Sequence, residues 1–189
     1  MKKVDFNVIP DMHNAQSFKQ ATPLPVSSSD ILKHIKKLDA ELSFFSFHRE
    51  VLIGYLPFSL AKDLLTEKFL EEFDENSWRQ KVTVEEALAE AKEYSRFGWG
   101  KIIDHRGIST SRTIDKMKSW MFLLGDTEMI RLCETESAYM PYGAPILYKI
   151  CKKYGWDIPE FDTGTVGSGT VGNMIRGLPC STSCSECIH

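Results

Sequence analysis

The residue types best suited to chemistry gather near the end of this 189-residue sequence. Its last ten residues contain three cysteines and a histidine: Cys180, Cys184, Cys187 and His189. Thiolates and imidazoles are the preferred ligands of zinc, and this spacing allows them to surround one tetrahedral ion. We therefore predict a zinc site, with His189 or a cysteine of another chain as the fourth ligand. The alternatives are a redox-active thiol or a tail with no chemistry of its own.

A second candidate is a basic segment in the middle of the chain. Residues 96–118 contain six basic and two acidic residues, whereas residues 62–93 contain five basic and ten acidic residues. The basic segment holds a glycine-containing turn between two predicted helices, an order typical of a helix-turn-helix. We expect this face to contact a nucleic acid, or an acidic protein partner, through Arg106, Ser109, Ser111, Arg112 and Lys116. The alternative is a solvated surface on which the same charges form salt bridges.

Acid–base candidates are few. Asp104 precedes His105, and His48, Arg49 and Glu50 are consecutive. Neighbouring residues of a helix point in different directions, so adjacency in sequence does not indicate a catalytic pair. We therefore predict a non-catalytic interaction protein. The alternative is a small enzyme or metal-dependent factor that uses the C-terminal cysteine cluster.

Composition favours one globular domain with no strong charge. Hydrophobic residues make up 42% of the chain and aromatic residues 11%, which is enough to fill a core. The net charge of −3 gives no overall basic field to attract nucleic acid or an anionic membrane. No apolar run has the length of a membrane span or of a signal peptide, so we expect a cytoplasmic protein without a membrane partner.

The positions of apolar residues predict an all-α fold. Residues 1–28 are expected to form an irregular arm, residues 29–158 a compact multi-helix domain and residues 159–189 a flexible tail rich in glycine and cysteine. Predicted helices cover residues 30–43, 83–97, 109–124, 126–134 and 144–154, with a short buried helix before Pro57 and one amphipathic helix from Leu60 to Phe73. The sequence also allows the helix that begins at residue 83 to continue past Gly98 and Gly100 to about residue 103.

Local signals and packing expectations complete the prediction. Thr83 and Glu86 form a capping box, and Gly125 is expected to end a helix. Cys133 and Cys151 lie on apolar helix faces and are expected to be buried packing residues. The predicted core residues are Leu64, Leu88, Met117, Trp120, Leu124 and Leu147.

Overall fold

The computed structural model describes residues 21–40, 48–103, 108–136 and 144–159. Within these ranges the chain forms eight helices, and the only strand-like pairing there is an isolated bridge between Pro23 and Thr83. The all-α prediction is therefore confirmed. The helices are α1 (Ser28–Ala40), α2 (His48–Ile53), α3 (Phe58–Ala61), α4 (Glu67–Glu72), α5 (Val84–Ile103), α6 (Ile108–Leu123), α7 (Thr127–Glu136) and α8 (Ala144–Tyr154).

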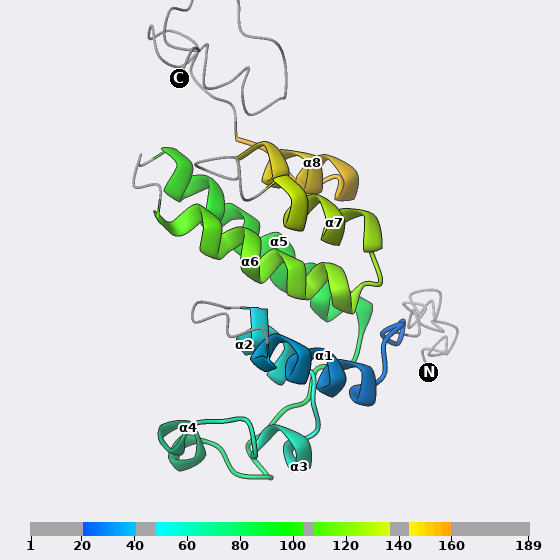
Figure 1. The fold of residues 1–189 in the computed structure, drawn as a ribbon, viewed down its shortest axis with the longest axis vertical. Coiled ribbons are helices and arrows are strands. Elements are labelled where there is room, and N and C mark those ends of the chain that lie inside the picture. Colours follow the sequence, from blue (N-terminus) through cyan, green and yellow to red (C-terminus); the bar gives the residue numbers. More distant parts are fainter. Residues whose placement is uncertain (1–20, 41–47, 104–107, 137–143, 160–189) are drawn as a thin grey trace, which may run out of the picture.

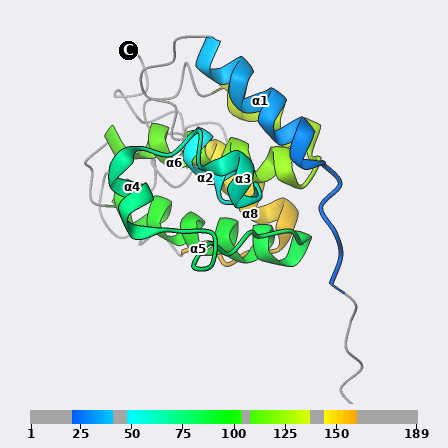
Figure 2. The same cartoon turned by 90° about the horizontal axis from the view of Figure 1, so that it is seen from below.

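The α6 helix is at the centre of the fold and packs against α2, α5, α7 and α8. Figure 1 shows α5 and α6 side by side, with α7 and α8 on one side of them and α1 and α2 on the other. The α3 and α4 helices lie at the far end, beyond α1 and α2. Figure 2 views the molecule from that end, so that α3 and α4 are in front of α2 and α6.

The predicted core residues all contribute to one hydrophobic cluster. Met117, Trp120 and Leu147 are buried in it, as predicted. The other three are partly buried and pack against the cluster: Leu64, Leu88 and Leu124. Burial of side chains from most helices in one cluster explains why short, individually unstable helices are held in place.

Both described cysteines are buried, as predicted. Burial raises the pKa of the Cys133 thiol to about 12 and also raises the pKa of the Cys151 thiol. The two side chains are therefore neutral at physiological pH and act as small packing residues.

The predicted helix ends are confirmed at several positions. The Glu86 amide donates to Thr83 Oγ1 at 3.2 Å, and the Thr83 amide donates to Glu86 Oε2 at 3.1 Å, which completes the capping box of α5. Gly125 follows α6 with a φ of 69°, and Gly155 follows α8 with a φ of 67°. This left-handed conformation favours glycine, so the sequence marks both ends correctly.

The α5 helix continues through Gly98, as the sequence allows, because α6 and α8 approach closely there. A Cβ atom at position 98 would lie 2.6 Å from Thr113 Cγ2 and 2.9 Å from Leu147 Cδ2. Glycine at this position therefore permits the close packing of three helices.

The single helix predicted from Leu60 to Phe73 is wrong, because this run forms two short helices, α3 and α4. The Leu64 carbonyl, which a continuous helix would use internally, accepts a hydrogen bond from Arg49 Nη2 at 3.2 Å. Thr66 is extended, with a ψ of 158°, and α4 begins directly after it. A tertiary contact thus competes with the continuation of the helix.

The segment before α1 pairs with the start of α5. The Leu24 amide donates to the Val82 carbonyl at 3.1 Å, and the Val84 amide donates to the Thr22 carbonyl at 2.9 Å. Leu24 and Val26 are partly buried against the core. Lys81 lies two positions before Thr83, which pairs with Pro23, and it contributes to the site described next.

Candidate functional site

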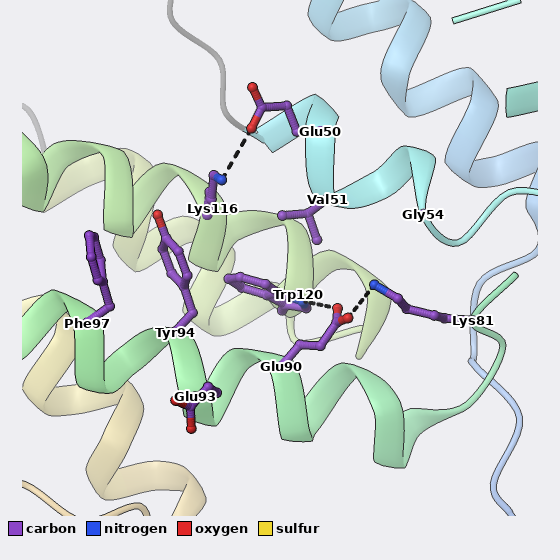
Figure 3. Close-up of a pocket in the computed structure, with 10 residues that line it drawn as sticks. All are labelled: Glu50, Val51, Gly54, Lys81, Glu90, Glu93, Tyr94, Phe97, Lys116 and Trp120. Atoms are coloured by element: carbon purple, nitrogen blue, oxygen red, sulfur yellow. Dashed lines mark hydrogen bonds and ion pairs between the residues drawn. The ribbon is translucent and has the colours of Figure 1, made fainter. Parts of the chain in front are cut away.

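A broad hollow of about 560 Å³ lies between α2, α5 and α6, which we call the α2–α5–α6 groove (Figure 3). This volume is within the range of ligand-binding pockets in proteins. The lining residues come from α2 and the turn after it, from the segment before α5, and from facing sides of α5 and α6. They are Glu50, Val51, Gly54, Lys81, Glu90, Glu93, Tyr94, Phe97, Lys116 and Trp120.

One wall of the groove is aromatic. Tyr94 lies between the other two rings, with its centroid 5.7 Å from Phe97 and 5.2 Å from Trp120. Trp120 is 4% exposed and anchors the wall in the core, whereas Phe97 is 50% exposed. The positions of Glu90, Tyr94 and Phe97 place them on the same face of α5. The wall thus presents apolar surface to solvent at one end.

Glu90 is the polar centre of the groove. Its Oε1 atom pairs with Lys81, and its Oε2 atom accepts hydrogen bonds from the Tyr55 hydroxyl at 2.8 Å and from Trp120 Nε1 at 3.2 Å. Burial, followed by the contact with Glu90, raises the pKa of Tyr55, so the hydroxyl stays protonated and donates. Glu90 therefore links α5 to the segment before it, to the turn after α2 and to α6.

The second lysine of the groove also has a glutamate partner. Lys116 Nζ lies 3.2 Å from Glu50 Oε2 and 5.3 Å from the centroid of the Tyr94 ring. At the rim, Glu93 pairs with Arg96 at 3.6 Å. The charges of the groove are therefore nearly balanced, and its apolar wall is its distinguishing feature.

A second cluster of interest lies where α1, α2 and α6 meet. His34 Nε2 and His48 Nε2 are 3.2 Å apart, and His34 stacks on Phe122 with a centroid distance of 4.1 Å. His48 Nδ1 contacts Ser119 Oγ, which also donates to the His48 carbonyl oxygen at 2.5 Å. Since the hydroxyl proton is used on the carbonyl, Nδ1–H donates to Ser119 and leaves Nε2 of His48 as the acceptor for His34.

This histidine–serine contact is structural, although the two residue types also occur in hydrolases. Ser119 is fully buried and His48 is 5% exposed, so a substrate cannot reach the hydroxyl. Burial, with smaller effects of His34 and Lys118, lowers the pKa of His48 to about 3. His48 is therefore neutral at physiological pH.

The three consecutive residues at the start of α2 diverge, as expected for neighbours on a helix. His48 points into the core, Arg49 pairs with Asp39 at 3.1 Å, and Glu50 faces Lys116 in the groove. They do not form a catalytic group.

The structure places the predicted basic face at the start of α6. Ser109, Ser111 and Arg112 lie in α6, but only their backbone is described, and Arg106 lies outside the described residues. Lys116 lines the groove. The α5 and α6 helices run side by side (Figure 1), whereas the helices of a helix-turn-helix cross at a wide angle. The helix-turn-helix prediction is therefore not supported.

Three basic residues of this segment are in ion pairs with acidic residues. Arg96 and Lys116 have the partners given above, and Lys118 lies 3.7 Å from Asp115. This agrees with the alternative of a salt-bridged surface for the described side chains, and the prediction of nucleic-acid contact stays a prediction.

The predicted zinc ligands, Cys180, Cys184, Cys187 and His189, lie outside the described residues. Among the residues that the structure does describe, no group of three potential metal ligands comes together. The zinc site thus stays a prediction. Replacing Cys180 and Cys187 together would abolish stoichiometric zinc in the purified protein if the tail binds it.

The groove could not be predicted from the sequence, because its residues come from three separate segments. The spacing of Glu90, Tyr94 and Phe97 in α5 was the one indication of the groove in the sequence, since it places a carboxylate and two aromatic rings on one helix face.

Among the described helices, none is both long and apolar enough to cross a membrane. No family model, curated protein or solved structure matches this chain.

Proposed function

We propose that this protein is a non-catalytic interaction protein that binds apolar side chains of a protein partner in the α2–α5–α6 groove. The observation that carries this proposal is the aromatic wall, in which half-exposed Phe97 continues the packed rings of Tyr94 and Trp120. Aromatic residues in a hollow with a polar rim are typical of the energetic centre of a protein interface.

The charges of the groove favour a peptide over a nucleic acid. Both lysines are paired with glutamates, so a phosphate backbone would have to displace Glu50 and Glu90 while it approached their negative charges. A peptide with an apolar anchor needs no such exchange, and its amide groups can hydrogen-bond to the paired side chains at the rim.

The polar side chains at the centre of the groove are engaged with one another, which favours a binding function. Glu90 already accepts from Tyr55, Trp120 and Lys81, which leaves it poorly placed to take a proton from a substrate. The histidine–serine contact is buried elsewhere. The groove is therefore suited to recognition.

A peptide selection tests this proposal. Peptides are selected from a random displayed library on the wild-type protein, and the affinity of each selected peptide is measured by fluorescence anisotropy. Phe97→Ser is expected to weaken binding by about tenfold or more, because the exposed aromatic contact is lost. Val82→Ser is the matched control, since Val82 is also 49% exposed but lies outside the groove. Equal affinities for wild type and Phe97→Ser would contradict the proposal.

The nucleic-acid alternative has its own signature. We expect no binding of a single-stranded oligonucleotide at low salt. Binding that weakens steeply with salt, and whose salt dependence becomes shallower by about one unit in Lys116→Met, would instead assign this face to phosphates.

A further inference from the structure

A second surface lies on α4, at the end of the molecule remote from α8 (Figure 1). All described side chains of residues 66–71 are exposed, and none of the described side chains of α4 is buried. Phe69 is 50% exposed and Leu70 42% exposed, and they are adjacent. A helix of six residues is far too short to be stable by itself, so contacts with the rest of the chain must hold α4 in place. Phe69 and Leu70 are largely exposed, and their apolar surface is therefore available to a partner.

The region around α4 is held firmly on its inner side. Phe73 contacts Trp78 edge to face, with centroids 6.1 Å apart, and Trp78 Nε1 donates to the Leu56 carbonyl at 3.0 Å. Asp74 Oδ1 closes the following turn by accepting from the Ser77 amide at 2.8 Å. We call residues 58–78 the α3–α4 projection. Its inner residues position α4, while Phe69 and Leu70 lie on the outside.

The charges of the projection lack the compensation seen elsewhere. Residues 62–75 contain six acidic and two basic residues. Asp63, Glu67, Glu71 and Glu75 form no ion pair with any other described residue, whereas the glutamates of the groove do. The exposed apolar pair therefore lies in a segment with four more acidic than basic residues, and no ion pair between described residues neutralises these four carboxylates.

We propose that Phe69 and Leu70 dock into the apolar face of a basic amphipathic helix on a protein partner. Lysine or arginine residues beside that face would meet Glu67 and Glu71, which are three positions before and one position after Leu70, and Lys68 is the single basic residue of α4. The two apolar side chains supply buried area, and the carboxylates favour a partner of opposite charge over an acidic one. This surface is distinct from the groove and is independent of the function proposed for it.

A designed peptide of about 18 residues, with leucines on one helical face and lysines on the other, serves as the probe. A matched peptide with glutamates in place of the lysines is the charge control. Binding to the full chain is measured by fluorescence anisotropy. We expect the Leu/Lys peptide to bind and the Leu/Glu peptide not to bind.

The variants locate the binding surface. Phe69→Ser combined with Leu70→Ser should weaken the Leu/Lys peptide by about tenfold or more. Val82→Ser should change its affinity by less than about twofold, because Val82 is also 49% exposed but lies neither in the projection nor in the lining of the groove. Glu67→Gln combined with Glu71→Gln should reduce the salt dependence of binding.

Three outcomes would overturn this inference. The first is no binding of the Leu/Lys peptide at about 100 µM, and the second is equal binding by wild type and the Phe69/Leu70 double variant. The third is a wild-type dimer, seen by sedimentation, that the double variant abolishes, since a second copy of the chain would then cover the surface.

Discussion

The α2–α5–α6 groove and the α3–α4 projection differ in whether their charged residues form ion pairs and in whether their apolar side chains are buried. In the groove, Lys81 and Lys116 each meet a glutamate, and the exposed ring of Phe97 continues a wall that ends in buried Trp120. On the projection, Asp63, Glu67, Glu71 and Glu75 form no ion pair with another described residue, and the exposed pair of Phe69 and Leu70 lies on a helix with no buried described residue.

This difference distinguishes side chains that stabilise the folded protein from side chains that remain exposed and available to a partner. Side chains that bridge distant segments, such as Glu90, stabilise the packed body and also shape its groove. Side chains that stay largely exposed, such as Leu70, contribute little to folding. Substitutions in the two regions should therefore differ in their effects on stability.

The largest difference should come from the aromatic wall. Trp120→Ala removes a ring that is 4% exposed, so the loss of buried area and the resulting cavity should reduce the free energy of unfolding by about 3 to 5 kcal/mol. Urea denaturation followed by circular dichroism measures this change. A loss below about 1 kcal/mol would mean that the wall is not part of the core, and the contrast with the projection would fail.

The next effect is a loss of stability in acid. Because burial lowers the pKa of His48 from its ordinary value of 6.5 to about 3, its neutral form stabilises the fold above pH 6.5, and this stability is lost as pH falls toward 3. Between pH 6.5 and 4.5 the loss should be roughly 2 to 3 kcal/mol. Denaturation of wild type and His48→Gln at both pH values tests this expectation, since the variant should lack most of the dependence.

A smaller effect separates paired from unpaired carboxylates. Glu90→Gln removes the charge that Lys81, Tyr55 and Trp120 share and should cost about 1 to 2 kcal/mol. Glu71→Gln, on the projection, should change stability by about 0.5 kcal/mol or less. Parallel melts of the two variants make the comparison direct, and equal effects would show that Glu90 does not hold the groove together.

Much of the fold could be predicted because local signals determine it. The capping box of Thr83 and Glu86, the helix-ending Gly125 and the buried Met117 were all evident from spacing and residue type. The division of the predicted helix after Leu60 was not evident, because it depends on a hydrogen bond from Arg49.

The candidate sites were harder to predict for the same physical reason. Positive charge around Lys116 indicated a phosphate-binding face, but its partner Glu50 lies 66 positions earlier in the sequence and becomes adjacent only when α2 packs on α6. Local composition reports the charge of a segment and cannot report which charges are neutralised by distant residues.

A further small effect is the one on which the comparison depends most. Phe69→Ser combined with Leu70→Ser should leave the free energy of unfolding within about 1 kcal/mol of the wild-type value, because both side chains already contact water over 40% or more of their surface. Thermal melts of this variant and of Phe97→Ser measure it. A loss close to that of Trp120→Ala would show that α4 packs into the body, and its apolar pair could then no longer be assigned to a partner. A negligible loss together with weaker binding of the Leu/Lys peptide would separate recognition from folding in this part of the chain.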